Sequence, residues 1–208
     1  YALSGDPAGE QLLLKLDVNT GQSLAEAALS GLDLVVDVDH DIIWLVGTDV
    51  TKLNLALEPQ FTLDVIGWQA VAVDRRSTGG VWVAEQANLA VPGSANRLIH
   101  LTKEGGTPTT VDLPLLPMAI AVDRSDDSIW VAMNVSANSG KLVKYDSMGA
   151  ELLTVETGGV WSVSVNQTDG SIWAGGRDGR VYHYDRLGSP LAAVAGFSAR
   201  SKYIGIQP

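Results

Sequence analysis

A phrase of alternating apolar residues, a short polar turn and an apolar pair ending in tryptophan recurs along the chain. Three copies align without a gap, Leu32–Trp44, Met118–Trp130 and Trp161–Trp173, and a fourth, Gln69–Trp82, has one extra residue in its turn. Alternation predicts strands with one buried face, and the Asp, Ser, Thr and Gly residues between them favour hairpin turns. Repetition at a period of roughly 40 residues is typical of solenoids and propellers.

Each unit continues with a third alternating strand and then, after a Gly- or Pro-bearing turn, a fourth. The third strands are predicted at Leu12–Asp17, Thr51–Ala56, Arg97–Thr102, Lys141–Asp146 and Arg180–Asp185. A helical period does not occur anywhere in the sequence. Four antiparallel strands per unit predict an all-β fold, a β-propeller of four-stranded antiparallel blades.

The repeat also predicts the domain organisation. We expect a single domain over residues 1–208, with units of roughly 1–31, 32–67, 68–116, 117–159 and 160–202 and a closing strand at 203–208. Tyr1 aligns with the tryptophans of the second strands, and Tyr203–Gln207 matches a first strand. The C-terminal strand would then close the first blade, which gives about five blades. The alternative is a fragment of a propeller of six to eight blades.

Composition narrows the classes of function. Hydrophobic residues make up 46% of the chain and charged residues 18%, as in a folded globular protein. A net charge of −10 without a Lys- or Arg-rich run argues against nucleic-acid binding. An apolar run long enough to span a membrane, roughly 18 residues, does not occur. The acidic, cysteine-free β composition leads us to expect an extracytoplasmic location, within a larger bacterial exported or surface protein.

Two stretches carry a resemblance to known repeats: Asp126–Asp146 (DDSIWVAMNVSANSGKLVKYD) and Asp169–Asp185 (DGSIWAGGRDGRVYHYD). They resemble the repeats of NHL-type and YVTN-type β-propellers, and gluconolactonase-like and virginiamycin lyase-like propellers share the pattern. The resemblance covers nearly the whole chain and implies a propeller fold. Because these families include scaffolds, ligand binders, lyases and metal-dependent hydrolases, it implies no single activity.

Residues that recur at equivalent positions have a structural interpretation. Polar residues end the first strands, and we expect their side chains to cap the turns that follow: Asp37, Asp74, Asp123 and Asn166. Aromatic residues recur in the second strands and are expected to pack between blades: Trp44, Trp82, Trp130 and Trp173.

Histidines and clustered aspartates are the natural candidates for metal ligands. His100 and His183 share one place in the third strands, which other units fill with Lys15, Asn54 and Lys144. This pattern predicts a polar, solvated strand face, and His40 is expected to be exposed in a turn. The run Asp37–Asp41 has D-x-D-x-D spacing that could offer oxygens to Ca²⁺, but it lacks the glycine and the distal glutamate of a dedicated loop. We therefore predict no metal site and no cofactor, with Ca²⁺ left open as an alternative.

A few residues are not explained by the repeat. Trp68, Trp161 and Tyr203 are expected at the crossings between units, near one end of the central channel. Glu85 and Asn134 follow second strands, and Arg177 lies in the short loop of the last unit. Because long loops on a rigid scaffold commonly carry binding, and Glu85–Asn96 is the longest loop of this kind, these six residues are the candidate ligand-binding set.

We expect a non-catalytic interaction or scaffold module that binds a protein, peptide or glycan on its loop-bearing face. The alternative is an enzyme at the channel mouth, a metal-dependent lactonase-like hydrolase or a lyase, with Glu85 and Asn134 in its ligand set. The sequence contains no G-x-S-x-G, phosphate-loop or H-E-x-x-H motif, and no catalytic residue is predicted. The oligomeric state is not predicted.

Overall fold

The computed structural model describes residues 1–5, 11–29, 31, 33–47, 49–64, 68–74, 79–87, 90, 93–106 and 109–196. Regular secondary structure within these residues consists of strands β1 to β19, all paired antiparallel, so the fold is all-β as predicted. Across this described part of the chain, no helix has the length and apolar character needed to cross a membrane.

Among the described residues, the strands form one three-stranded sheet and four four-stranded sheets, each built from consecutive strands. The first contains β1 (Ala2–Gly5), β2 (Gln11–Leu16) and β3 (Ser23–Ala27). The second contains β4 (Asp33–Asp37), β5 (Ile42–Val46), β6 (Asp49–Asn54) and β7 (Pro59–Asp64). The third contains β8 (Trp68–Val73), β9 (Gly80–Glu85), β10 (Arg97–Thr102) and β11 (Thr109–Asp112). The fourth contains β12 (Leu116–Asp123), β13 (Ser128–Ser136), β14 (Ser139–Tyr145) and β15 (Glu151–Thr157). The fifth contains β16 (Val160–Val165), β17 (Ile172–Gly176), β18 (Arg180–Tyr184) and β19 (Pro190–Ala195).

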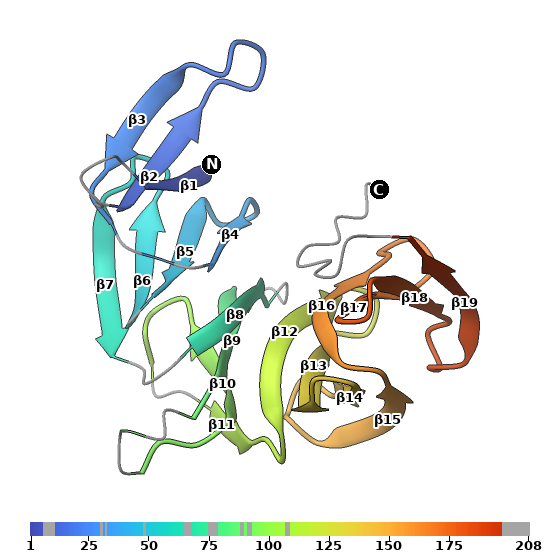
Figure 1. Cartoon of the computed structure of the whole chain (residues 1–208). Coiled ribbons are helices and arrows are strands. Elements are labelled where there is room, and N and C mark those ends of the chain that lie inside the picture. Colours follow the sequence, from blue (N-terminus) through green and yellow to red (C-terminus); the bar gives the residue numbers. More distant parts are fainter. Residues whose placement is uncertain are drawn as a thin grey trace.

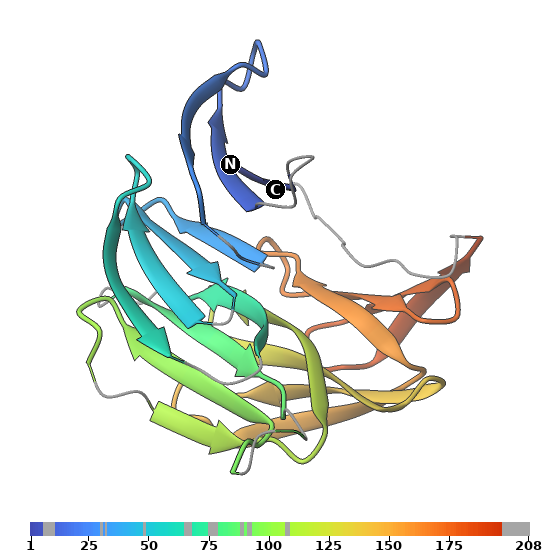
Figure 2. The same ribbon diagram turned by 60° about the vertical axis from the view of Figure 1, so that its left-hand side comes forward.

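The sheets follow one another in an arc, with β1–β3 at one end and β16–β19 at the other (Figure 2). The first strands β4, β8, β12 and β16 contact one another in sequence, and β7, β11, β15 and β19 lie on the outside (Figure 1). This arrangement is consistent with a propeller-like fold. The predicted closing strand, Tyr203–Gln207, lies outside the described residues.

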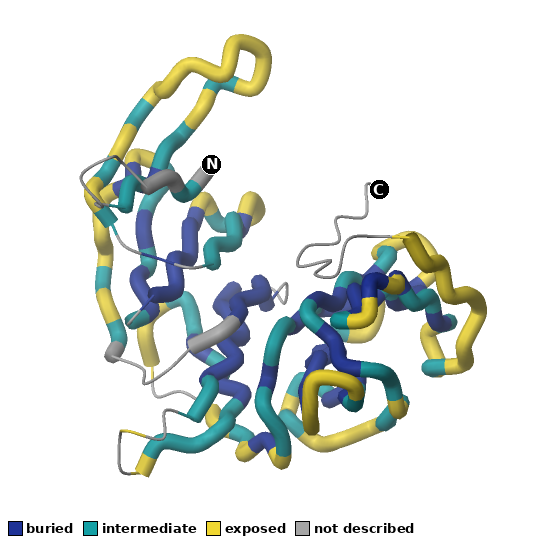
Figure 3. The backbone as a smooth tube through the Cα atoms, viewed as in Figure 1, coloured by how far each residue is buried: buried dark blue, intermediate teal, exposed yellow. Residues whose placement is uncertain are grey.

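The buried apolar side chains that the structure describes form four clusters, one between each pair of consecutive sheets. Trp44, Trp82 and Trp130 are fully buried, each between its own sheet and the next one along the chain. The packing predicted for these three tryptophans is therefore confirmed. Burial is densest in the middle strands and falls toward the outer strands and turns (Figure 3).

Polar side chains at strand ends hold the turns, as predicted for the first strands. Asp37, Asp123 and Asn166 each accept a hydrogen bond from the backbone N–H two residues later, at 3.2, 2.9 and 3.0 Å. A second set, which the sequence analysis did not identify, follows the third strands. Its members accept in the same way from the turn before the fourth strand: Asp17, Asn54, Asp146 and Asp185. In the second, fourth and fifth sheets, local bonds thus stabilise both the turn after the first strand and the turn after the third strand.

The prediction of a solvated face at His100 and His183 is wrong. In every four-stranded sheet the residue opposite the tryptophan is basic, and the equivalent of His100 in the second sheet is Lys52, not Asn54. The side chain of His100 is only 12% exposed, with Nε2 2.6 Å from Asp74 Oδ2. His183 is half-buried and stacks on Trp173 at 4.0 Å. The reason is alternation, which places this residue on the tryptophan's face of the sheet.

His40, expected to be exposed, is also half-buried, because its Nδ1 lies 2.9 Å from the buried carboxylate of Asp37. The imidazole therefore helps to hold the turn between β4 and β5 and is not a free surface group.

Each of the two end sheets has one face that is partly exposed, whereas the equivalent faces of the inner sheets are buried. Leu16 is 38% exposed, whereas its equivalents Leu53, Leu101, Tyr145 and Tyr184 are between 0 and 6% exposed. Trp173 is half-buried, in contrast to the three fully buried tryptophans of the inner sheets. The tryptophan face of the last sheet and the leucine face of the first sheet are thus the two incompletely covered surfaces of the arc.

Candidate functional site

The candidate ligand-binding residues that the structure describes lie at one end of the sheets, where second strands turn into third strands. Trp68 pairs with Glu85 across β8 and β9, Asn134 pairs with Leu116 across β13 and β12, and Arg177 follows β17 directly. Trp68 is described by its backbone position alone, and Tyr203 lies outside the described residues. We call this end of the molecule the loop face.

Trp161 was expected at a crossing between sheets, but it lies inside β16. The pairing of β16 with β17 shifts between Val160 and Ser162, so Trp161 occupies a β-bulge. A bulge turns a side chain away from the regular alternation, and this one leaves the indole half-buried rather than in the core.

Arg177 stacks on this indole, so the structure brings two of the candidate residues together. The guanidinium carbon lies 4.3 Å from the centre of the Trp161 ring, well within cation–π range. The backbone N–H of Arg177 donates to Gly159 O at 2.7 Å, which fixes the turn that carries it. Within the part of the chain that the structure describes, no carboxylate or carbonyl accepts from the Arg177 guanidinium.

Asp178 and Tyr182 form a polar pair beside this stack. Tyr182 Oη donates to Asp178 Oδ2 at 2.7 Å, and Arg180 Nε lies 3.7 Å from the same oxygen. Burial and the adjacent Asp178 carboxylate raise the pKa of the Tyr182 hydroxyl, so it remains a donor at neutral pH. Tyr182 is a residue of this surface that the repeat pattern did not indicate. Its signal was a tyrosine at a strand position that other units fill with Leu14, Thr51, Ile99 and Val143.

Gly159 allows three segments of the chain to meet beside the Trp161 and Arg177 side chains. A Cβ on Gly159 would lie 2.2 Å from Ala137 O in the turn between β13 and β14, and 2.9 Å from Arg177 Cδ. Only glycine fits such a backbone approach. The patch formed by Trp161, Arg177, Asp178 and Tyr182, named here the Trp161 patch, therefore rests on a close-packed support.

Glu85 and Asn134 are held in contacts within the protein. Asn134 is buried, its Nδ2 donates to Val160 O at 2.9 Å and its Oδ1 accepts from Val160 N–H at 2.8 Å. These bonds tie β13 to β16 of the next sheet. Glu85 is also buried, with Oε2 3.4 Å from Arg97 Nε. In the described residues, including Asp37–Asp41, no group of three or more His, Cys, Asp or Glu side chains could hold a metal ion.

Asp33 is a further polar residue at this end that the sequence analysis did not select. It stands where other first strands carry Ala70, Ala119 and Ser162, and its Oδ2 accepts from Val71 N–H of the next sheet at 3.2 Å. Burial raises its pKa from 3.8 to about 6. Because the pKa of Asp33 is higher in the folded state than in the unfolded state, protonation of its carboxyl group stabilises the fold. This contribution to the free energy of unfolding is fully present below pH 3.8 and is lost as the pH rises through about 6.

Neither a protein-family model nor a curated protein sequence matches this chain. A functional assignment must therefore come from the geometry of the loop face and of the remaining surface.

Proposed function

We propose that this protein is a non-catalytic β-propeller interaction module that binds a protein or peptide partner through the Trp161 patch. The arc of consecutive antiparallel sheets, with first strands inside and fourth strands outside, supports the propeller assignment. The half-buried indole and its stacked guanidinium support the choice of binding surface.

We propose further that the ring has five blades, closed by contact between the two end sheets. Where a four-stranded sheet meets the next sheet along the chain, the face that carries its tryptophan packs on the face of the next sheet that does not carry a tryptophan. The last sheet offers a tryptophan face with Trp173, and the first sheet offers an opposite face with Leu12, Leu14 and Leu16. These surfaces are complementary by the same rule, and closure would remove apolar area from water.

The observation that carries the binding proposal is the state of Arg177. Its guanidinium is oriented by the Trp161 ring, yet its in-plane N–H donors have no acceptor among the described residues. A planar fork of this kind binds a carboxylate through two parallel hydrogen bonds. The partner segment is therefore expected to present an Asp, a Glu or a C-terminal carboxylate, with an apolar group beside it to contact the indole.

The test is a selection of random displayed peptides on the immobilised protein, followed by fluorescence anisotropy with the enriched sequences. Carboxylate-bearing peptides should be enriched, and Arg177→Ala should weaken their binding by at least about tenfold. A charge-assisted bond contributes about 1.5–3 kcal/mol, and about 1.4 kcal/mol corresponds to a factor of ten. Trp161→Ala should have a similar effect.

Arg186→Ala is the matched control, since Arg186 is a partly exposed arginine of the same sheet that lies in the turn before β19, away from the loop face, where its Nη2 donates to Ser125 Oγ at 2.7 Å. It should bind as the unaltered protein does. Equal binding by Arg177→Ala and the unaltered protein would exclude the Trp161 patch. Binding to a glycan array combined with no peptide enrichment would show that the partner is a glycan instead.

A further inference from the structure

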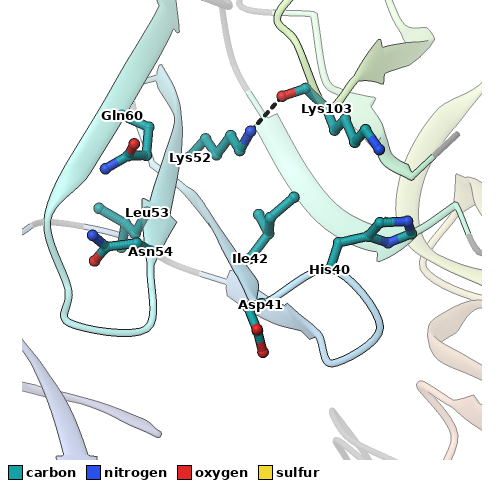
Figure 4. A pocket seen from close by; sticks show the side chains of 8 residues that line it. All are labelled: His40, Asp41, Ile42, Lys52, Leu53, Asn54, Gln60 and Lys103. Atoms are coloured by element: carbon teal, nitrogen blue, oxygen red, sulfur yellow. Dashed lines mark hydrogen bonds between the residues drawn. The ribbon is translucent and has the colours of Figure 1, made fainter.

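A cavity of about 360 Å³ opens at the end of the sheets opposite to the loop face. It lies between the second and third sheets, where the β4–β5 turn faces the residues that follow β10 (Figure 4). Its walls are formed by His40, Asp41, Ile42, Lys52, Leu53, Asn54, Gln60 and Lys103. Its volume is within the range of small-molecule sites, about 300–1,000 Å³.

The charge of the lining is opposite to that of the whole chain. Lys52 and Lys103 are cationic and His40 adds an imidazole, whereas the chain carries a net charge of −10. Asp41 is the acidic residue of the lining, and its exposed carboxylate is directed away from the two lysines (Figure 4). Two acids lie nearby: Glu58, whose Oε2 accepts from Asn54 Nδ2 at 2.7 Å, and Glu104, with Oε1 4.0 Å from Lys103 Nζ.

The basic groups are positioned by contacts that leave donors unused. Lys52 Nζ donates to Lys103 O (Figure 4). Its charge lies 5.7 Å from the centre of the Phe61 ring. An ammonium has three donors, so two remain for a ligand. His40 Nδ1 is held by Asp37, which leaves Nε2 as the ring atom available to a ligand.

Close packing brings His40 and Lys103 together from different sheets. A Cβ on Gly79 would lie 3.1 Å from the His40 ring and 3.2 Å from Lys103 Cδ, so both side chains flank this glycine. The buried side chain of Ile42, which belongs to the core between the second and third sheets, supplies an apolar wall. Cationic donors beside an apolar wall are suited to an organic anion.

We propose that this cavity binds a small molecule through an anionic group, a carboxylate or a phosphate, held by Lys52, Lys103 and His40. The site is separate from the Trp161 patch, because it lies at the other end of the sheets and uses different strands. Ligand binding in this cavity does not depend on the proposed interaction function.

The test is a titration of the full 208-residue protein with inorganic phosphate and, separately, with acetate, at constant ionic strength set by chloride, followed by ¹H–¹⁵N chemical shifts. We expect saturable shifts confined to residues around the cavity. Lys103→Met should raise the dissociation constant by at least about fivefold, since it removes one charge-assisted contact. The ion pair of the Lys103 ammonium with Glu104 is long, at 4.0 Å, and exposed, so this variant should keep its fold.

Lys141→Met is the matched control. Lys141 is exposed to the same degree as Lys103, bonds Glu156 at 2.8 Å, and lies at the loop face. It should leave the titration unchanged. Saturation with phosphate alone would assign a phosphate-bearing ligand, and saturation with acetate alone a carboxylate-bearing one. Shifts that do not saturate, that chloride reproduces, that Lys103→Met leaves unaltered, or the lack of any shift would each overturn the proposal.

Discussion

Replacing Trp130 with alanine is expected to lower the free energy of unfolding by about 3–5 kcal/mol, the usual range for removing a fully buried tryptophan. Trp130 is 0% exposed and packs against Val160, Val163 and Ile172 of the following sheet. The substitution would leave a cavity between two sheets, where rigid neighbouring strands limit collapse. Urea-induced unfolding followed by circular dichroism gives the measurement.

The control for this prediction is Leu152→Ala, on the outer strand of the same sheet. Leu152 is 56% exposed, so its truncation should change the free energy of unfolding by no more than about 0.5 kcal/mol. If the two variants lose similar stability, the tryptophans do not form the contacts between sheets that the structure describes.

Asn134→Ala is expected to destabilise the protein by about 2–4 kcal/mol. The change removes two hydrogen bonds and leaves the buried N–H and C=O of Val160 without their side-chain partner. An unsatisfied buried polar group costs about 1–3 kcal/mol. Thermal unfolding should therefore shift to clearly lower temperature, although the change is small in volume.

Two variants refine this second prediction. Asn138→Ala removes an exposed asparagine from the adjacent turn and should be nearly neutral. Asn134→Asp retains an acceptor for Val160 N–H, but at neutral pH it buries an unpaired carboxylate whose second oxygen faces Val160 O, so it should destabilise the protein at least as much as Asn134→Ala. An Asn134→Ala protein with unaltered stability and lost partner binding would contradict the structural role and return Asn134 to the binding surface.

The strands could be predicted from the sequence because they follow local rules. Alternation located the first, second and third strands of each unit, and turn residues such as Asp123 and Asn166 have the capping role expected of them. The error at Lys52 shows the limit of this approach. The segment TKLNLA (Thr51–Ala56) can be aligned with the other third strands in two registers, which place either Lys52 or Asn54 at the position of His100. Only the pairing of Trp44 with Lys52 in the structure shows that Lys52 is the equivalent residue.

The candidate site was less predictable, because it depends on contacts between sheets. Trp161 and Arg177 were selected individually, but their stacking depends on a bulge in β16 and on the close approach at Gly159. Asn134 was selected as a ligand-binding residue because it follows a strand, and its bonds to Val160 come from a neighbouring sheet. The cavity of Lys52 and Lys103 joins residues about 50 positions apart, which no local pattern reveals.

The central claim is that five sheets close into one ring, and distances between spin labels test it directly. The chain contains no cysteine, so pairs of introduced cysteines can be labelled selectively. Asn19, Met148 and Leu187 occupy equivalent exposed turn positions, since the backbone N–H of each bonds the capping aspartate two residues before it. Met148→Cys with Leu187→Cys reports the distance between neighbouring sheets.

Asn19→Cys with Leu187→Cys reports the distance between the first and last sheets, measured by double electron–electron resonance with unlabelled protein added in excess. A closed five-bladed ring predicts that both pairs give the same distance to within a few ångströms, because both would then join neighbouring blades. A distance for the Asn19 pair that is longer by about 10 Å or more, the spacing of one packed sheet, would contradict closure.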